Sequence, residues 1–545
     1  MKNRYLITAF TCLALCLCSA AAFAQSPKPT PTRADILRGE YGRYRANNDL
    51  LYYHLDVRID PEKKFISGKN TIRFKMLSDD KRIQLDLYDN LNIDKIMLGT
   101  ETLKYERTDG AVFVDFPKTL KRGQTYSIDF HYSGEPKTTG RFGGFTFGTD
   151  PKGRPWIFTA CEGEGASIWW PNKDQWRDEV ENMDISIAIP NDLIDVSNGR
   201  FQNKKDLGDG YIQWNWLVNH PINNYSVSVN IGAYTHFADH LGDLTLDFYV
   251  LPEDLERAKP QFAQAKPMIE AFQSYFGEYP FKSDGYKLIH VPYSGMEHQS
   301  AVTYGNRFAN GYLERDWTGV GISDKFDFII IHESGHEWFG NSVSAADRSD
   351  MWIHEGWTTY LECLYVEYMF GYEDYLKYTN AYKSKIMNNE PVIAPRGINA
   401  TPPQDMYFKG ALFIHTLRGI VNDEKKWRTM LHDLYQTFKY KNIMTEDVAA
   451  FFSKAAERDL KPVFDQYLRH AEMPQLELKF DASKGTVDYR WIANEPKFAM
   501  PVKVGTKDKW QVIEATTQWR TMRSSIGKDN FEVATDLYYV DVKKQ

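Results

Sequence analysis

The chain has 545 residues, of which 42% are hydrophobic and 26% charged, and it carries 33 Tyr, 32 Phe and 14 Trp. This supply of large apolar side chains excludes a disordered chain and a small disulfide-stapled fold, and the length predicts roughly three or four domains. The formal net charge is −7, with no basic excess that would indicate nucleic-acid binding. The only long apolar stretch is N-terminal, which excludes a multispanning membrane protein.

Residues 1–24 have the pattern of a secretory signal peptide. Lys2 and Arg4 form a basic start, residues 6–18 are apolar but too short for a comfortable membrane span, and Ala22 and Ala24 supply small residues for cleavage. We therefore expect an exported protein, periplasmic or secreted, with no membrane span in the mature chain. An uncleaved N-terminal anchor is the alternative.

The number of cysteines is compatible with an exported protein but does not by itself indicate one. Cleavage after Ala24 leaves Cys161 and Cys363. Two cysteines in a chain of this length do not make a disulfide framework, so we expect two free thiols, with a single bridge as the alternative. A lipoprotein anchored at Cys16 or Cys18 is disfavoured because a Leu, rather than a small residue, precedes each of them.

Hydrophobic patterning divides the remaining chain. Leu55, Val57 and Ile59 are separated by charged residues, and this period of two continues with turn signals to about residue 245. Helical spacing follows, interrupted by short β-like pieces, and alternation returns after Pro474. The predicted parts are a linker at 25–40, an antiparallel β domain at 41–245, an α+β domain at 246–472 and a C-terminal β domain at 473–545.

The strongest motif is His332-Glu333-Ser334-Gly335-His336. On a helix, residues four apart share one face, so both imidazoles can reach one metal while Glu333 lies beside them, able to hold a water molecule. Taken alone, the motif also fits two solvent-facing histidines. Glu355 follows after eighteen intervening residues and supplies a third ligand.

Two histidines and one glutamate leave one coordination position open for water, and nitrogen and oxygen ligands in a tetrahedron favour zinc. A structural zinc site would be closed by four protein ligands and would usually recruit cysteine. The sequence therefore predicts a catalytic zinc site, with one Zn²⁺ per chain held by His332, His336 and Glu355.

This spacing resembles that of the gluzincin aminopeptidases, the family of alanyl aminopeptidase and leukotriene A4 hydrolase. Thermolysin-type endopeptidases share the zinc chemistry, but Ser294-Gly295-Met296-Glu297-His298 resembles the exopeptidase motif Gly-Ala-Met-Glu-Asn. The resemblance implies that Glu297 binds the substrate's free α-amino group and that Gly295 and Met296 contact the substrate. The chain departs from the motif at Ser294, Gly295 and His298, and we expect His298 to pack rather than to bind metal.

Two further segments resemble the same family. Tyr407-Phe408-Lys409-Gly410-Ala411 is similar to its Tyr-x-Lys-Gly-Ala segment, which implies that Tyr407 donates a hydrogen bond to the oxyanion. Thr159-Ala160-Cys161-Glu162 is similar to Thr-Gln-Cys-Glu, which implies that Glu162 is a second carboxylate at the substrate amine. Ala160 replaces the usual Gln, so the preferred N-terminal side chain stays open.

The resemblance covers almost the whole mature chain. It implies a saddle-like N-terminal β domain, a thermolysin-like catalytic domain and a small C-terminal β-sandwich-like domain. The chain would then be a compact, bacterial-type member without the large C-terminal helical domain, and we expect a more open site.

The activity implied is removal of N-terminal residues from peptides with a free N-terminus, with Glu333 as general base. The alternatives are a zinc endopeptidase on the same scaffold and a catalytically silent peptide-binding protein. Nothing in these residues specifically supports an epoxide hydrolase activity, and the sequence does not indicate the oligomeric state.

Overall fold

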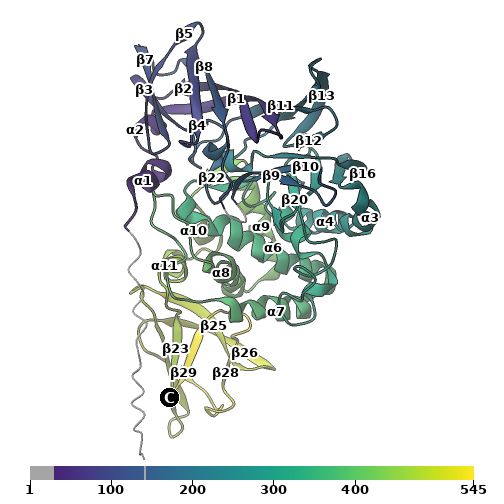
Figure 1. Ribbon diagram of the computed structural model, residues 1–545. Helices are drawn as coiled ribbons and strands as arrows, with labels where there is room; N and C mark the ends of the chain where they lie inside the picture. The colour runs from purple at the N-terminus through teal and green to yellow at the C-terminus, as the bar shows by residue number, and fades with distance from the viewer. Residues whose placement is uncertain (1–29, 140–142) are drawn as a thin grey trace, which may run out of the picture.

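A computed structural model describes residues 30–139 and 143–545. The N-terminal β domain, the helix-rich middle domain and the C-terminal β domain follow one another from one end of the molecule to the other (Figure 1). The expected signal peptide lies outside the described residues. The expected linker was too long at its C-terminal end, because Arg33–Gly39 forms helix α1, which begins with a capping box between Thr32 and Asp35.

The N-terminal domain is built on an eight-stranded sheet. In spatial order its strands are β13 (Arg200–Asp206), β14 (Tyr211–Val218), β11 (Asn182–Pro190), β1 (Asn48–Asp60), β2 (Phe65–Met76), β8 (Thr125–Gly134), β4 (Leu91–Leu98) and β5 (Glu101–Thr102). The alternation seen in the sequence is the alternation of burial, since Leu55, Val57 and Ile59 are fully buried. We expected an antiparallel domain, and this was wrong for one strand pair of the sheet, because β1 pairs with β11 in parallel.

Two smaller sheets complete this domain. One contains β12 (Ile194–Ser197), β15 (Val229–Gly232), β10 (Pro155–Ala160) and β9 (Gly144–Thr149), and the other contains β3 (Asp80–Asp86), β7 (Ala111–Leu120) and β6 (Lys104–Thr108). The short helix α2 (Arg43–Ala46) precedes β1. Strand β10 ends immediately before Cys161 and Glu162, and it thereby delivers Glu162 to the junction with the middle domain.

The middle domain begins with a five-stranded sheet. Its strands are β16 (Thr235–Leu241), β17 (Leu244–Val250), β18 (Tyr286–His290), β20 (Val302–Tyr304) and β19 (Gly295–Met296). The expected boundary at 245/246 was wrong, because it falls inside β17, and sheet pairing places it between β15 and β16. The hairpin β16–β17 has the same period of two as the preceding domain, so patterning alone could not reveal that it joins a different sheet.

Helices make up most of the middle domain. They are α3 (Leu255–Phe262), α4 (Ala265–Phe276), α5 (Phe328–Gly335), α6 (Trp352–Phe370), α7 (Tyr372–Ala381), α8 (Asp405–Val421), α9 (Glu424–Phe438), α10 (Thr445–Ala455) and α11 (Lys461–Arg469). Strands β21 (Val343–Ala345) and β22 (Lys441–Ile443) pair in parallel between them. No helix within the described ranges is long and apolar enough to cross a membrane.

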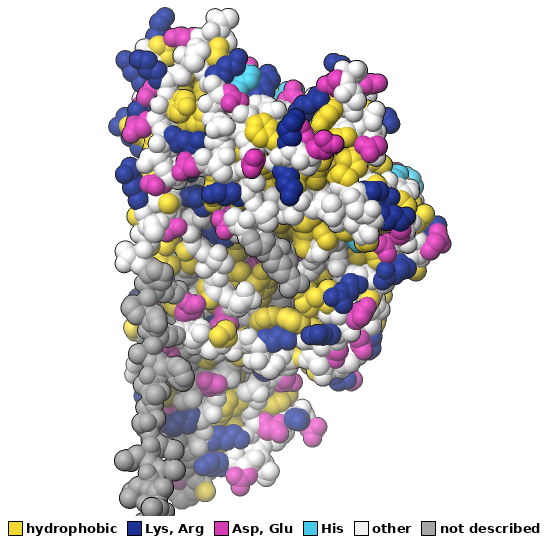
Figure 2. Space-filling model, viewed as in Figure 1, with side chains coloured by type: hydrophobic (Ala, Val, Ile, Leu, Met, Phe, Trp, Pro, Cys, Tyr) yellow, Lys and Arg dark blue, Asp and Glu magenta, His cyan; other side chains and the backbone are white. Residues whose placement is uncertain are grey.

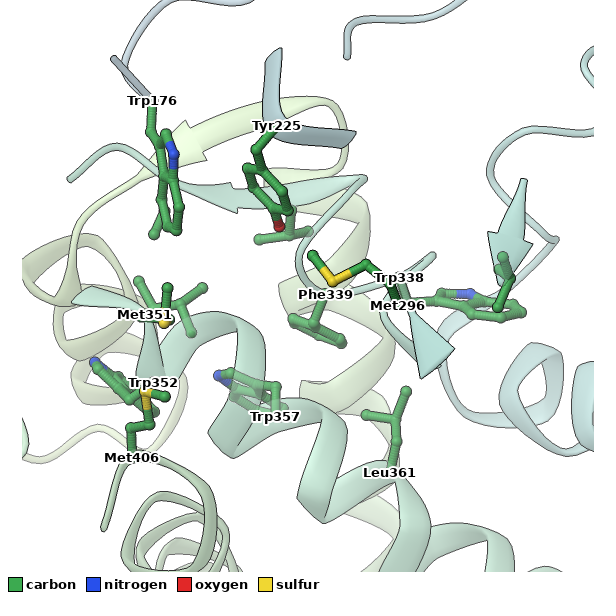
Figure 3. Close-up of a cluster of buried hydrophobic side chains, with 14 of the residues drawn as sticks. Trp176, Tyr225, Met296, Trp338, Phe339, Met351, Trp352, Trp357, Leu361 and Met406 are labelled. Carbon is green, nitrogen blue, oxygen red and sulfur yellow. The ribbon is translucent and has the colours of Figure 1, made fainter. Parts of the chain in front are cut away.

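Helix α6 is the central element of this domain. Every residue from Trp352 to Val366 is buried, which is typical of a helix surrounded by protein on all sides. Trp357 stacks on Phe339 with ring centroids 4.8 Å apart, and Trp352, Trp357 and Leu361 project into the apolar cluster of Figure 3. This packing immobilises the helix that carries Glu355.

Helix α6 crosses α8 at very short range. A Cβ atom on Gly410 would lie 2.9 Å from the Cα atom of Gly356, so only glycine permits this approach. The Gly of the Tyr-x-Lys-Gly-Ala segment therefore brings Tyr407 next to the helix that carries Glu355.

The C-terminal domain consists of two sheets, as expected. One contains β27 (Arg520–Arg523), β24 (Thr486–Ile492), β23 (Gln475–Asp481) and β29 (Asp541–Lys544), and the other contains β26 (Lys509–Thr516), β25 (Ala499–Thr506) and β28 (Glu532–Val533). Trp491 of the first sheet donates its indole N–H to the carbonyl oxygen of Met500 in the second at 2.9 Å. Leu476 and Trp491 of the first sheet and Met500 and Val502 of the second are buried, so the two sheets share one apolar core.

The cysteines of the described residues and the charged side chains of the surface match the expectations from the sequence. Cys161 and Cys363 are buried free thiols. On the face shown in Figure 2, basic and acidic side chains are interspersed.

Candidate metal and catalytic site

Helix α5 carries the His-Glu-x-x-His motif. Asp327 caps its N-terminus by accepting hydrogen bonds from the backbone N–H groups of Ile329 and Ile330 at 3.1 and 3.3 Å. His332 and Glu333 lie in the last turns of the helix, and His336 follows its last residue. The expected helix is therefore present and begins at Phe328.

Three atoms from α5 and α6 converge at the predicted metal site. Oε2 of Glu355 lies 3.5 Å from Nε2 of His332 and 3.4 Å from Nε2 of His336, and the two nitrogens are 3.4 Å apart. Ligands held about 2.0–2.1 Å from a tetrahedral zinc lie roughly 3.3 Å from one another. Donor types and spacing therefore both fit a zinc ion.

The other ring nitrogens of the two histidines are held in place by the protein. Nδ1 of His332 lies 2.7 Å from Oε1 of Glu362, and Nδ1 of His336 lies 3.0 Å from the carbonyl oxygen of Phe339. These contacts fix the ring orientation that points each Nε2 at the common centre. Glu362 was not among the predicted site residues, although it lies two helical turns after Glu355 and therefore on the same face of α6.

Glu297 and Glu162 lie against the metal-binding residues. One carboxylate oxygen each from Glu162, Glu297 and Glu355 lie within 4.8 Å of one another, as do ligand atoms of Glu297, Glu333 and His336. The hydroxyl of Tyr225 donates to Glu297 at 3.1 Å, whereas a buried oxygen of Glu162 has no hydrogen-bond partner among the described residues. The five residues therefore form one acidic site, in which Glu162 is half-buried and the other four are buried.

Burial and mutual repulsion shape the acid–base properties of these carboxyl groups. Burial, followed by the charge of Glu297, raises the pKa of Glu162 well above its usual range, and burial likewise raises the pKa of Glu297. Burial also raises the pKa of Glu333 to about 7. A cation bound among these carboxyl groups would offset their mutual repulsion and favour their ionised forms.

Buried Arg348 is a second residue that the sequence did not reveal. Its guanidinium donates to the side-chain oxygens of Asn399 and Thr401, both at 3.2 Å. It also counteracts the rise in the pKa of Glu162 through its charge. Because 185 residues separate Arg348 from Glu162 in the chain, the sequence did not indicate that the fold would bring them close together.

The close packing of β19 on α5 explains one departure from the family motif. Glu297 directly follows β19, the edge strand of the five-stranded sheet, and Met296 is buried in that strand. A Cβ atom on Gly295 would lie 2.7 Å from Cγ2 of Ile329 and 2.8 Å from Cγ of Glu333. Glycine at this position therefore lets the strand approach the catalytic helix.

The position of His298 agrees with a packing role. The side chain is fully buried, and neither ring nitrogen has a hydrogen-bond partner among the described residues. Burial lowers its pKa to about 3, so the ring is neutral. His298 does not belong to any of the candidate metal-binding groups found in the described part of the chain.

Tyr407, near the start of α8, faces the metal site. Its ring centroid lies 6.2 Å from that of His332. Burial raises the pKa of its hydroxyl well above 10, so this group remains a neutral hydrogen-bond donor.

A cavity of about 200 Å³ opens beside His332, Glu333 and Tyr407. The remaining residues that line it are Ser294, Tyr312, Trp317, Phe328, Ile329, Thr359, Glu362, Gln404 and Phe408. Of the predicted site residues, His332, Glu333 and Tyr407 line this cavity, while Glu162, Glu297, His336 and Glu355 lie in the cluster beside it.

Comparisons with known proteins give a consistent result. The peptidase family M1 domain matches residues 261–467, and the peptidase M1 N-terminal domain matches residues 50–225. The chain is 22% identical to probable aminopeptidase 2 of Sulfurisphaera tokodaii and 23% identical to aminopeptidase N of Rattus norvegicus. These alignments cover 75% and 74% of this chain but 52% and 42% of the relatives, so the chain spans about half of their length.

Solved structures agree on the fold. A mutant of an M1 zinc metallopeptidase from Deinococcus radiodurans has a TM-score of 0.65 at 19% identity, and the alignment covers 79% of this chain and 96% of that chain. The wild-type structure of the same enzyme also has a TM-score of 0.65, at 20% identity, with 78% and 94% of the two chains covered. The two family matches together cover both the β domain that supplies Glu162 and the helical domain that supplies the metal-binding residues, and the chain belongs to peptidase family M1.

Proposed function

We propose that this protein is a zinc metallo-aminopeptidase that hydrolyses N-terminal residues from peptides. The observation that carries the proposal is the convergence of His332, His336 and Glu355 on one point, with carboxylate oxygens of Glu162 and Glu297 within 4.8 Å of Glu355. A metal site beside a pair of acids suits a substrate whose positive charge lies one residue from the bond to be cleaved.

The protein groups divide the work among them. His332, His336 and Glu355 would hold a zinc ion, which when bound would supply Lewis-acid activation of water and of the scissile carbonyl. Glu333 accepts the proton of the attacking water and later gives a proton to the leaving amine. The neutral hydroxyl of Tyr407 donates a hydrogen bond to the oxyanion that develops on the carbonyl.

Glu297 and Glu162 make the enzyme an exopeptidase in this proposal. Their charges stabilise a substrate ammonium and leave no favourable place for an acylated N-terminus, because a neutral amide would leave both carboxylates without a cation. The M1 zinc metallopeptidase of Deinococcus radiodurans, which shares the fold, was crystallised with a Tyr-Ser-Ala substrate. We infer that short peptides with a free N-terminus are also substrates of this chain.

The proposal is tested with free and N-acetylated aminoacyl arylamides and with metal analysis. We expect one zinc per chain in the wild type, in Glu333→Gln and in Glu373→Gln, an exposed matched control on α7. Only the free-amine substrates should be cleaved, and Glu333→Gln should lose about 10²–10⁴-fold in kcat.

Each alternative has its own result. Equal cleavage of free and acetylated substrates would identify an endopeptidase. Stoichiometric zinc without turnover of any substrate would identify a peptide-binding protein.

We further propose that the protein is exported, to the periplasm or beyond, after cleavage near Ala24. The support is the basic, apolar and small-residue order of residues 1–24. Mass spectrometry of the protein from the envelope or the medium should find an N-terminus near Gln25. An intact Met1 on a cytoplasmic protein would contradict the proposal.

A further inference from the structure

A second cavity lies outside the metal site, at the junction of the N-terminal and middle domains. Its volume is about 450 Å³, which is within the range of pockets that hold small organic molecules. Strands β13 and β14 of the first domain and β16, β17 and β18 of the second contribute to its lining. The proposed catalytic, metal-binding and amine-binding residues are not part of that lining. We call this cavity the junction pocket.

Two opposite charges lie side by side in the junction pocket. Asp247 and Lys287 are paired in register in the parallel strands β17 and β18, so their side chains lie on the same face of the sheet. They do not form an ion pair with each other. Nζ of Lys287 donates to the carbonyl oxygen of Gly199 at 2.6 Å, and Oδ1 of Asp247 lies 2.8 Å from Nε2 of His236.

Both charged groups have unused hydrogen-bonding capacity. Lys287 is only 3% exposed, and among the described residues its ammonium uses one of three N–H groups, the one directed at Gly199. Burial lowers the pKa of Lys287 to about 8, so the ammonium form predominates at neutral pH. Oδ2 of Asp247 accepts no hydrogen bond from the described part of the chain. A buried ammonium is stabilised by an anion, and a carboxylate by a cation.

Aromatic rings form a wall of the same pocket. The ring centroid of Phe201, on β13, lies 5.6 Å from that of Trp214 and 5.3 Å from that of Trp216, both on β14. Tyr249 follows Asp247 by two residues on β17 and therefore lies on the same face as the charges. Phe201 is 40% exposed, so this wall reaches the solvent. A ligand ring would bury apolar surface here and gain aromatic contacts.

The wall and the acceptor of Lys287 are held in place by the protein. Gly199 has a φ of 77°, a Cβ atom there would lie 2.2 Å from the carbonyl oxygen of Leu217, and its N–H donates to Oγ of Ser300 at 2.9 Å. The guanidinium of Arg200 donates to the carbonyl oxygen of Ser283 at 2.9 Å, which fastens the start of β13 to the middle domain. A ligand that enters the pocket therefore loses little free energy to ordering of the protein.

One class of small molecule matches this arrangement of charges and rings. A free aromatic α-amino acid carries a carboxylate and an ammonium on one carbon and a ring one carbon away. A molecule with a single charge leaves either Lys287 or Asp247 without a partner. We propose that the junction pocket binds a free aromatic α-amino acid, with its carboxylate at Lys287, its ammonium at Asp247 and its ring against Phe201 and Trp214.

The first test varies the ligand and uses the unaltered zinc-loaded protein. Calorimetry measures the affinity for L-phenylalanine and for three analogues. These are 3-phenylpropionate without the ammonium, 2-phenylethylamine without the carboxylate, and L-alanine without the ring. A hydrogen bond between charged groups and the burial of a phenyl ring are each worth about tenfold or more in affinity, so every analogue should bind at least about tenfold more weakly. Equal affinities for L-phenylalanine and either singly charged analogue would contradict the proposal.

The second test varies the protein. Lys287→Met and Asp247→Asn should each weaken binding of L-phenylalanine about tenfold or more, and Trp214→Ala about three- to tenfold. Lys287 is buried, so its variant could also disturb folding, whereas Asp247 and Trp214 are only half-buried. Unchanged affinity in both Asp247→Asn and Trp214→Ala would overturn the assignment.

Two control variants match these changes in chemistry. Asp243 lies in the turn of the same β16–β17 hairpin with a side chain that is 92% exposed, so Asp243→Asn should keep the affinity. Trp519 of the C-terminal domain is an exposed ring with Nζ of Lys479 4.3 Å from its centroid. Trp519→Ala should also keep the affinity, and a loss in this variant would show that L-phenylalanine binds to exposed rings beside cations in general.

A further variant separates the junction pocket from the catalytic site. L-Phenylalanine is also a product of the proposed aminopeptidase reaction, and Glu297→Gln removes the proposed ammonium contact at the metal site. We expect Glu297→Gln to retain the binding that Asp247→Asn loses. If Glu297→Gln abolishes all binding and Asp247→Asn none, the pocket assignment fails and the proposed function stands. If the wild type cleaves no peptide but Asp247→Asn still loses the binding, the proposed function fails and the pocket assignment stands.

Discussion

Nδ1 of His332 lies 2.7 Å from Oε1 of Glu362, within hydrogen-bond distance. Tyr378 donates to the other carboxylate oxygen of Glu362 at 3.2 Å, and Tyr382 donates to the same atom. This buried glutamate therefore connects a metal-binding histidine to two tyrosines from α7 and the turn that follows it. An anion here fixes the tautomer of His332 and increases the electron-donating strength of its Nε2.

Glu362→Gln should weaken zinc binding about 10–100-fold, because the charge that supports His332 is lost while the side-chain shape is kept. Competition with a chelator of known affinity measures the change, with the exposed Glu373→Gln as control. An unchanged zinc affinity would show that Glu362 only fills space.

Tyr407→Phe should lower kcat by about 10²–10³-fold with little change in KM or zinc content. The hydroxyl is proposed to bond the oxyanion, which exists only after attack on the carbonyl, so its loss affects the transition state and not the bound substrate. Steady-state kinetics on a free aminoacyl arylamide provides the measurement. If KM rises while kcat is kept, Tyr407 binds the substrate instead.

Glu297→Gln should reduce kcat/KM for free-amine substrates roughly 10–100-fold, because a hydrogen bond between charged groups contributes about 1.5–3 kcal/mol. Cleavage of N-acetylated substrates should stay at its low level, so the discrimination between the two classes shrinks. Glu162→Gln is expected to act in the same direction. Retained discrimination in both variants would place the ammonium elsewhere.

Gly410→Ala should destabilise the middle domain by about 1–3 kcal/mol, since a new methyl group at a helix crossing forces the backbones apart. The Cβ atom would lie 2.9 Å from Cα of Gly356. Because α6 carries Glu355, zinc affinity should fall as well. Thermal unfolding with and without zinc tests both effects, and Gly527→Ala, whose Cβ would meet no atom within 4 Å, should change neither.

Glu179 should make stability depend on pH. It lies at the junction of the N-terminal and middle domains, where Asn442 donates to its Oε1 at 2.8 Å, and burial raises its pKa from 4.5 to about 7. The folded protein therefore holds this proton more tightly than the unfolded chain, so the stabilisation is complete below pH 4.5 and is lost as pH rises through about 7.

The free energy of unfolding is measured by denaturant titration between pH 4 and 8 for the wild type and for two variants. The wild type should lose more stability across this interval than Glu179→Gln, and the exposed Glu181→Gln should behave like the wild type. Parallel curves for the wild type and Glu179→Gln would contradict the assignment.

Local sequence patterns were sufficient to predict the metal-binding motif and the division of the chain into β, helical and β parts. The helix around His332 and Glu333 follows from local residue order, as does the alternation that marks the strands. The same patterns erred at the hairpin β16–β17, which has the period of two of the preceding domain but belongs to a different sheet. They also missed α1, whose start is marked only by Thr32 and Asp35, a short signal next to a proline-rich stretch.

The sequence by itself determined which chemistry is available: two imidazoles and a carboxylate at helical spacing, a nearby base, and further acids in separate segments. Only the tertiary structure decided which of these groups meet. Glu162 reaches Glu297 because the end of β10 in one domain contacts Tyr293, just before the edge strand β19 of the next, and Glu362 and Arg348 gain their partners by packing alone. The physical reason is that spacing along a helix or strand is set by local backbone geometry, whereas distances between elements are set by side-chain volume, as at Gly410 and Gly295.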